Sequence, residues 1–514
     1  MTPQSLYAWF AASVEAYPEA TAIEVRGRAL SYRHLHDVVE ELAALIASRP
    51  GGPYRRIAVP SDRGAIGYVA YLAVQRLGAT VVPVNPDFPS QRNAAIFAAA
   101  EVDLLVVDTD GIAFSQIPHG ITAVAVSMDE LERGSADRGV LPAYHSSEDD
   151  VAYILFTSGS TGTPKGVPIE HRNLNRYLDF HIRRFQVGPG CRLSQVFDLT
   201  FDLSVFDMFV GWGAGATVVV ADRIDLLSPA DYIREKRLTH WFSVPSVVSL
   251  AGEDGSLRPA SLPSLRWSIF CGERLTYRQA GAWAAAAPGS SIDNLYGPTE
   301  LTISCTAYRL PANRDEWPRT HNDTVPIGPV LPWLEALIVD ERGDEGDVGE
   351  LCVRGPQRFA GYLDPVENQH RFFEPALADT RGHSGPLTDD HYYRTGDVVR
   401  VEPAGIVHVG RVDHQIKNRG FRIEPGDIEA VLNRHPSINE AIVVTPHDGS
   451  EPELLAAYTG DPVAVNELMQ YTHQHLPAYM VPVGFVRLES LPRTSNGKVD
   501  RRSITKTVQS VWRV

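Results

Sequence analysis

The feature that most constrains this chain is an apolar run at 151–156 (VAYILF) that leads directly into the loop TSGSTGTPKG at 157–166. A short, wholly apolar run bounded by turn residues predicts a strand buried in a parallel sheet. Glycines in the loop let its backbone approach a ligand closely, and hydroxyl and N–H groups, with Lys165, suit phosphate oxygens. A Walker A loop would end in Gly-Lys-Ser/Thr, which this loop lacks. The sequence therefore predicts a phosphate-binding loop of another kind.

The rest of the chain predicts an α/β protein with mainly parallel sheets. Helix-like and strand-like segments alternate through the first half, at 64–77, 80–84, 90–100 and 103–107. From about residue 325, short β-like runs indicate a β-rich subdomain. After residue 411, two helical segments alternate with two strands, which indicates a small α+β domain. We expect two domains, an N-terminal core at 1–412 and a C-terminal domain at 413–514.

Composition narrows the function classes. The net charge of the 514 residues is −16, which argues against a nucleic-acid partner, since that needs a basic face. Four scattered cysteines without a C-x-x-C pair predict neither a disulfide framework nor structural zinc. The N-terminus lacks a signal-peptide pattern, and no apolar run approaches membrane-spanning length. We expect a soluble, cytoplasmic protein with no membrane partner.

Further motifs follow the loop in order. They are Val82-Pro83-Val84-Asn85-Pro86, Asn294-Leu295-Tyr296-Gly297-Pro298-Thr299-Glu300, Gly349-Glu350-Leu351, Tyr393-Arg394-Thr395-Gly396-Asp397, Gly410-Arg411-Val412-Asp413 and Asn496-Gly497-Lys498. With the loop, they resemble the adenylate-forming superfamily, which includes acyl-CoA synthetases, firefly luciferase and the adenylation domains of nonribosomal peptide synthetases. The resemblance covers essentially the whole chain. A G-x-G-x-x-A match at 211–216 precedes its strand instead of following it, so a nicotinamide site is rejected.

The resemblance implies roles in activating a carboxylate with ATP and Mg²⁺. Thr299 is expected to bind the α-phosphate, and Glu300 to be the Mg²⁺ ligand, because this hard cation prefers carboxylate oxygen. Asp397 suits the ribose hydroxyls, with Arg411 in support. The residues expected to bind ATP are Thr157, Ser158, Gly159, Ser160, Thr161, Gly162, Lys165, Asn294, Tyr296, Asp397 and Arg411.

The same resemblance assigns the C-terminal domain a catalytic and mobile role. Lys498 is expected to bridge the carboxylate and the α-phosphate. Asp413 occupies the position of an interdomain hinge, and Gly420 lies in the loop that would line a pantetheine tunnel. Asn418 departs from the apolar residue that the family usually has there, which bears on contacts to the thiol arm.

The segment TFDLSVFD at 200–207 indicates which acid is activated. In members of the family that activate amino acids, an aspartate here pairs with the α-ammonium of the substrate, and Asp202 fits. An unpaired buried carboxylate would be costly in an enzyme for acids without that charge. The other expected substrate-pocket residues are Leu203, Phe206, Ser243, Ile269, Cys271, Leu295, Ile303 and Ser304. Their bulk leaves room for a methyl group, so alanine is the first choice, then serine, glycine or cysteine.

The sequence thus predicts an amino acid–carrier protein ligase of nonribosomal peptide or natural-product biosynthesis. It would form aminoacyl-AMP and pass the amino acid to the phosphopantetheine thiol of a separate carrier protein. The segment Phe270-Cys271-Gly272-Glu273 also resembles D-alanine–carrier protein ligases, which keeps D-alanine open. Two alternatives are an acyl-CoA synthetase for another acid, which Asp202 argues against, and a non-catalytic nucleotide-binding protein. The latter would be expected to lack Lys498, Glu300 or the loop.

Overall fold

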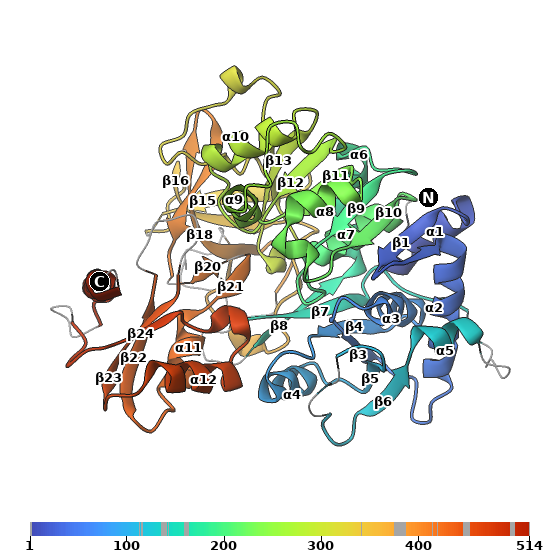
Figure 1. The fold of residues 1–514 in the computed structure, drawn as a ribbon, viewed down its shortest axis with the longest axis horizontal. Coiled ribbons are helices and arrows are strands. Elements are labelled where there is room, and N and C mark those ends of the chain that lie inside the picture. The colour runs from blue at the N-terminus through green and yellow to red at the C-terminus, as the bar shows by residue number, and fades with distance from the viewer. Residues whose placement is uncertain are drawn as a thin grey trace. The chain divides into compact units, whose positions relative to one another are not determined.

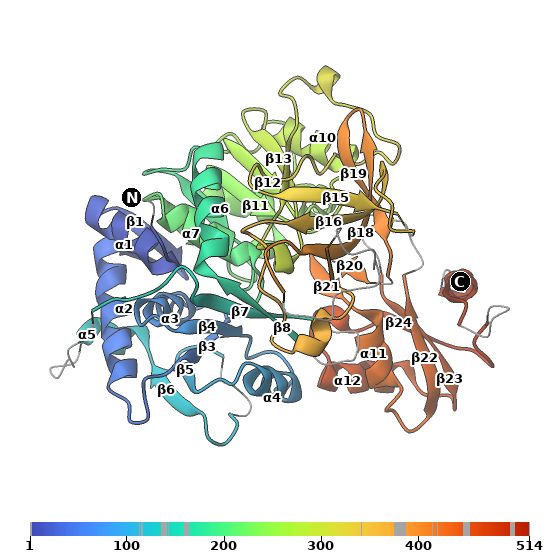
Figure 2. The same cartoon turned by 180° about the vertical axis from the view of Figure 1, so that it is seen from behind.

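The computed structural model describes most of the chain (Figures 1 and 2). The described residues are 3–112, 114, 117–134, 141, 143–158, 164–340, 342–374, 387–413, 415–418, 420–445, 453–493 and 499–512. Among them, no helix combines the length and the apolar character needed to cross a membrane.

The first large sheet contains the strand that precedes the predicted phosphate loop. Its order is β6-β5-β3-β4-β7-β8, and the registered pairs among β3 to β7 are parallel. Apolar residues face both sides of these short strands, as expected for a sheet covered on both faces. The strands are β3 (Arg56–Pro60), β4 (Thr80–Val84), β5 (Leu104–Asp108), β6 (Thr122–Val126), β7 (Val151–Thr157) and β8 (Lys165–Glu170).

A second, eight-stranded sheet has the order β14-β13-β12-β11-β9-β10-β1-β2. Its six central strands are parallel, and an antiparallel strand closes each edge. The strands are β1 (Thr21–Val25), β2 (Arg28–Ser31), β9 (Arg192–Gln195), β10 (Thr217–Val220), β11 (His240–Ser243), β12 (Trp267–Phe270), β13 (Ser291–Tyr296) and β14 (Thr306–Arg309).

Helices cover these sheets. All ten residues of α7 (Leu203–Trp212) are buried, as expected for a helix that is apolar all round. Side-chain caps begin several others; Ser31, for example, accepts a hydrogen bond from the His34 N–H at 3.2 Å. The other helices before residue 300 are α1 (Leu6–Ala16), α2 (Tyr32–Ala47), α3 (Ala65–Arg76), α5 (Met128–Arg133), α6 (His171–Arg184), α8 (Pro229–Glu235), α9 (Ser246–Glu253) and α10 (Tyr277–Ala286), together with α4 (Ser90–Ala99), most of which belongs to the smaller unit.

A third sheet is antiparallel and corresponds to the predicted β-rich subdomain. Its strand β18 (Tyr392–Glu402) pairs with β16 (Val348–Arg354), β17 (Phe372–Phe373) and β19 (Gly405–Arg411), and β15 (Glu335–Val339) pairs with β16.

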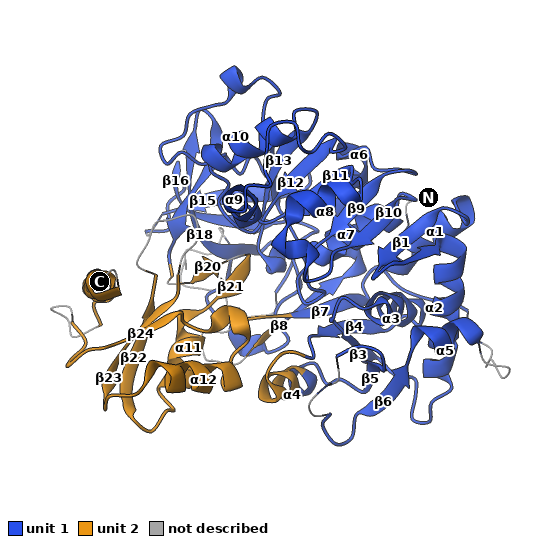
Figure 3. Ribbon diagram, viewed as in Figure 1, with its two compact units in different colours: residues 1–86, 97–155, 166–412 blue, residues 87–96, 156–165, 413–514 orange. Residues whose placement is uncertain are grey.

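The contacts divide the chain into two compact units (Figure 3). The longest segment of the smaller unit begins at Asp413, the residue at which the sequence places the domain boundary. It also includes the segments 87–96 and 156–165, which the sequence assigned to the core. Its own elements are the hairpin β20 (Ile416–Asn418) and β21 (Phe421–Ile423), the sheet of β22 (Ile438–Val444), β23 (Leu455–Gly460) and β24 (Gly484–Arg487), and the helices α11 (Pro425–Leu432), α12 (Val465–His475) and α13 (Arg501–Trp512).

Candidate active site

Asp202 lies at the start of α7 and is buried. The Thr299 hydroxyl and the backbone N–H groups of Ile303 and Leu203 act to lower the pKa of its carboxyl group. Burial, helped by the negative charge of Glu300, raises the pKa of Asp202 from 3.8 to about 7, although the donors act in the opposite direction. The charged form is therefore costly here until a cation joins it.

The other residues of the predicted substrate pocket surround the same region of the larger unit. Phe206 and Leu203 come from α7, and three come from the carboxyl ends of the adjacent parallel strands β11 and β12, where ligands of such sheets typically bind. Every predicted pocket residue is buried: Asp202, Leu203, Phe206, Ser243, Ile269, Cys271, Leu295, Ile303 and Ser304.

The two serine hydroxyls of this pocket are already bonded within the protein. Ser243 accepts a hydrogen bond from the Trp241 indole at 2.9 Å and donates to the Val244 carbonyl at 3.1 Å. The hydroxyl groups of Ser304 and Tyr177 lie 2.8 Å apart. Both hydroxyl groups therefore already have hydrogen-bond partners within the protein.

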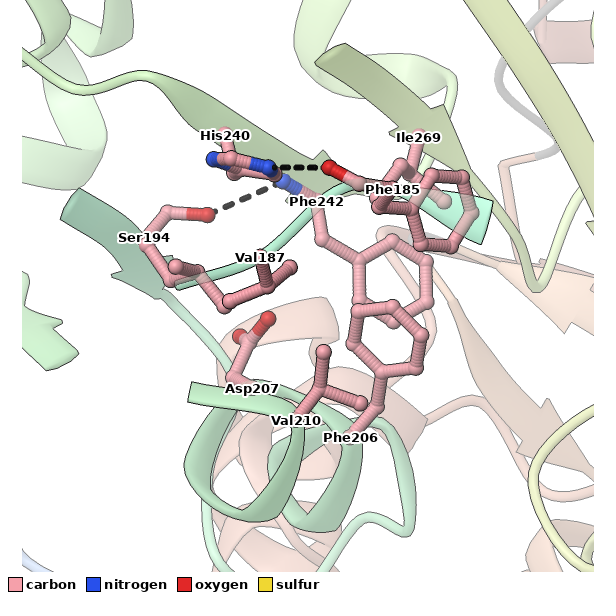
Figure 4. Close-up of a pocket in the computed structure, with 10 residues that line it drawn as sticks. Phe185, Val187, Ser194, Phe206, Asp207, Val210, His240, Phe242 and Ile269 are labelled. Atoms are coloured by element: carbon pink, nitrogen blue, oxygen red, sulfur yellow. Dashed lines mark hydrogen bonds between the residues drawn. The ribbon is translucent and has the colours of Figure 1, made fainter. Parts of the chain in front are cut away.

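A small cavity lies beside the Phe206 ring (Figure 4). Phe206 packs against Phe242, with ring centroids 4.5 Å apart, and both line the cavity together with Ile269. The Asp207 carboxyl group points into it from α7, and burial raises the pKa of that group well above its usual value. The space suits about one water molecule. Phe206 and Ile269 are therefore shared by the predicted pocket and this cavity.

Asn294, one of the residues predicted to bind ATP, uses its amide nitrogen in hydrogen bonds within the protein, whereas its amide oxygen does not. Its amide nitrogen donates to the carbonyl oxygens of Val325 and Pro326 at 3.2 and 2.9 Å. Its amide oxygen is buried and has no hydrogen-bond partner within the described part of the chain. A buried acceptor of this kind normally has a partner, and the exocyclic amino group of adenine would supply one.

Asp397 is the centre of a buried polar cluster. One carboxylate oxygen accepts from the Tyr296 hydroxyl at 2.7 Å, and the other accepts from Arg411 at 2.9 Å and lies 3.0 Å from His408 Nε2. The group is 1% exposed. Three of the predicted nucleotide residues therefore lie together, on β13, β18 and β19.

Two motifs hold Asp397 in place. Glu350 pairs with Arg394 at 2.6 Å, and its other oxygen accepts the Gly396 N–H at 2.8 Å. The Thr395 hydroxyl donates to the Leu351 carbonyl at 2.7 Å. Glu350, from the Gly-Glu-Leu motif, thus holds strand β18 immediately before Asp397.

Glu300 is fully buried, and its carboxylate accepts a hydrogen bond from the Tyr362 hydroxyl at 2.5 Å. Thr299, beside it, acts to lower the pKa of Asp202. Mg²⁺ binds proteins through one or two carboxylates plus substrate phosphates, and a single buried carboxylate at Glu300 fits that chemistry.

Both ends of the predicted phosphate loop are described, and residues 157, 158, 164 and 165 belong to the smaller unit. Thr157 ends β7 and Lys165 begins β8. The Ser158 hydroxyl donates to the Arg422 carbonyl at 2.8 Å, which brings that flank of the loop against the segment that follows Gly420. Asp413 accepts the Gln415 N–H at 3.2 Å. The other predicted residues, Gly159, Ser160, Thr161, Gly162 and Lys498, lie outside the described residues.

Family comparison decides the class. An AMP-binding enzyme model matches residues 10–363, and a model of the AMP-binding enzyme C-terminal domain matches 427–498. The chain belongs to the AMP-binding enzyme family. The predictions of its fold class and of an adenylate-forming amino acid–carrier protein ligase family are confirmed.

Individual relatives of the chain are of similar length or much longer. It is 33% identical over 513 residues to an L-proline–[L-prolyl-carrier protein] ligase of Pseudomonas fluorescens, covering 97% of this chain and 98% of the relative. It is 31% identical over 521 residues to tyrocidine synthase 2 of Brevibacillus parabrevis, covering 98% of this chain but only 14% of that relative.

Several solved structures match at nearly full length, among them the following two. Vibrio cholerae AlmE, in complex with glycyl-adenosine-5′-phosphate, has a TM-score of 0.82, 29% identity and 98% coverage of both chains. IdnL7 has a TM-score of 0.70 and 35% identity, with 99% of this chain and 100% of that chain covered.

The motifs alone missed several residues that complete the site. His408 and Tyr362 bond Asp397 and Glu300 from 11 and 62 residues away in sequence. Tyr177 lies 127 residues from its partner Ser304. The alternation along strand 405–411 could have placed His408 on the same face as Ile406 and Gly410, but no local signal gives its partner.

Proposed function

We propose that this chain activates a small α-amino acid, alanine first, and transfers it to a carrier protein. The observation that carries the proposal is Asp202, a buried carboxylate with a pKa raised to about 7 among apolar walls. A substrate ammonium beside it would offset the cost of the buried charge. Propionate, which lacks the ammonium, would leave that cost in place.

The chemistry runs in two steps. First, a substrate carboxylate oxygen bonds to the α-phosphorus of ATP and the bond to pyrophosphate breaks, which yields aminoacyl-AMP. Asn294 and Asp397 would hold the nucleoside, and Glu300 would hold Mg²⁺, which neutralises phosphate charge when bound. Lys498 would stabilise the negative charge that develops between the carboxylate and the phosphate.

Next, the phosphopantetheine thiol of the carrier bonds to the acyl carbon and AMP leaves, while the thiol proton passes to solvent. We propose that the C-terminal domain turns about Asp413 between the steps, since Lys498 and the Gly420 loop would serve the same site in turn. The bond from Ser158 to Arg422 supports this role for the loop. We also propose a cytoplasmic location, which four cysteines without a C-x-x-C pair favour, and a carrier protein separate from this chain, by analogy with the L-prolyl-carrier protein ligase relative.

Alanine and proline are the two candidate substrates that the assay must distinguish. Bulky walls at Phe206, Leu295 and Ile303 favour a side chain no larger than a methyl group, and the glycyl adenylate in AlmE is also small. Proline is the second candidate, because the full-length relative acts on L-proline. One methylene discriminates by about 1–3 kcal/mol, so neighbouring amino acids should be activated at lower rates.

Amino-acid-dependent ATP–pyrophosphate exchange tests the proposal, with L-alanine, D-alanine, glycine, serine, cysteine and L-proline compared. We expect alanine to give the highest kcat/KM. A higher value for L-proline would replace alanine by the second candidate. A higher value for a fatty or aryl acid would contradict the proposed function altogether.

A further inference from the structure

Two consecutive residues beside Asp202 adopt a backbone conformation that their side chains disfavour. Thr302 has φ 56° and Ile303 has φ 69°. Both are β-branched, and both are buried. The left-handed region is rare for such residues and persists only where the surroundings enforce it.

The side chain of Gln357 makes hydrogen bonds that hold residues 302 and 303 in this conformation. The amide nitrogen of Gln357 lies 2.7, 2.9 and 2.6 Å from the carbonyl oxygens of Leu301, Thr302 and Ser304. The backbone carbonyl of Gln357 accepts the Thr302 hydroxyl at 2.7 Å. The amide oxygen of Gln357 accepts the Trp333 indole N–H at 3.1 Å, which sets the orientation of the amide.

Gln357 itself has little freedom to move. It is 1% exposed and follows β16 by three residues, in the β-rich subdomain. A Cβ on Gly297 would lie 2.5 Å from the Ser304 Cα. The backbone of Ser304 therefore passes close to Gly297 as well as to the Gln357 amide.

This segment supplies two parts of the proposed amino-acid site. The backbone N–H of Ile303 acts to lower the pKa of the Asp202 carboxyl group, and the Ser304 hydroxyl bonds to Tyr177 in the pocket wall. The nucleotide cluster around Asp397 depends on other strands. Relaxation of residues 302–303 would displace the amino-acid site first.

We propose that Gln357 is a positioning residue that sets the affinity for the amino acid by holding Thr302 and Ile303 in their strained conformation. The inference rests on the proposed function, because it treats Asp202 as the ammonium anchor. The hydrogen bonds that Gln357 makes with residues 301–304 involve their backbone carbonyls and the Thr302 hydroxyl. Gln357 therefore acts through the backbone of this segment.

The test is Gln357→Met, which keeps the length of the side chain and removes its hydrogen bonds. In pyrophosphate exchange, the KM for the amino acid should rise about tenfold, equivalent to a loss of 1.4 kcal/mol, while the KM for ATP stays within about twofold of wild type. Gln279→Met is the matched control. That buried glutamine also bonds through its amide nitrogen, to Pro245 and Ser249, and its loss should lower the Tm without changing the KM for the amino acid.

A second substitution makes the role of strain testable. Glycine adopts positive φ freely, so Thr302→Gly in the Gln357→Met background should return the KM for the amino acid to within about threefold of Thr302→Gly alone. If Gln357→Met does not fold, Thr302→Val carries the test, because it keeps the strain and removes one bond to Gln357. It should raise the same KM about threefold.

Equal changes in both KM values, or no rescue by glycine, would overturn the inference and leave the proposed function intact. Wild-type enzyme that activates no amino acid would instead overturn the proposed function.

Discussion

Replacing Asp202 by asparagine should stabilise the unliganded protein while removing its activity. Burial raises the pKa of Asp202 from 3.8 to about 7. The folded state therefore binds the proton more tightly than the unfolded state, and the free energy of unfolding falls as the pH rises from about 4 to 7. Above pH 7 the full cost of the buried charge is present. A gap of about three pKa units, at 1.36 kcal/mol each, amounts to about 4 kcal/mol.

Asparagine is close in shape to the protonated acid and carries no charge. We expect Asp202→Asn to raise the free energy of unfolding by up to ~4 kcal/mol at pH 8 and by only ~2 kcal/mol at pH 5, where wild type is already largely protonated. Urea denaturation of both proteins at the two pH values measures this difference. Asp315→Asn is the control, because Asp315 is exposed and its substitution should change little.

The activity of the same variant completes the argument. Asp202→Asn should lose amino-acid-dependent pyrophosphate exchange, because its neutral amide carries no negative charge to pair with the substrate ammonium. A variant that is no more stable than wild type at pH 8, or whose gain does not shrink at pH 5, would refute the reasoning about the buried carboxylate.

Three further predictions concern other parts of the site. Lys498→Ala should reduce adenylate formation by about 10²-fold or more with ATP affinity retained, so near-normal exchange would exclude its assigned role. Phe206→Ala should destabilise the fold by ~3–5 kcal/mol, join the pocket to the cavity beside Asp207, and admit larger apolar amino acids; a substrate panel that still stops at alanine would contradict that geometry. Asp413→Pro fixes φ, so exchange should persist while loading of the carrier thiol, followed by intact-protein mass spectrometry, is largely lost; loading at the wild-type rate would exclude the hinge.

Strands and helices with strong local patterns could be predicted from the sequence. The run 80–84 is a strand with the expected ends, and the helix expected at 64–77 spans Ala65–Arg76. Wholly apolar or clearly periodic segments between turn residues leave few alternatives. The motif order also singled out Tyr296, Asp397 and Arg411, which are predicted to bind the nucleotide and which the fold brings together.

The partners of those residues could not be predicted in the same way. Gln357 bonds residues 53 to 56 positions earlier, and Tyr362 bonds Glu300. Such pairs depend on how the antiparallel sheet packs beside the parallel one, which no local periodicity encodes.

The most direct test of the central claim compares L-alanine with propionate, which has the same carbon skeleton without the ammonium, in wild type and in Asp202→Asn. The measured quantity is the ratio of kcat/KM for the two acids in pyrophosphate exchange. We expect wild type to favour alanine strongly and the variant to lose most of that preference, because only the carboxylate distinguishes the charged substrate. A variant that still prefers alanine by the wild-type ratio, or a wild type that prefers propionate, would contradict the assignment of Asp202 as the ammonium anchor.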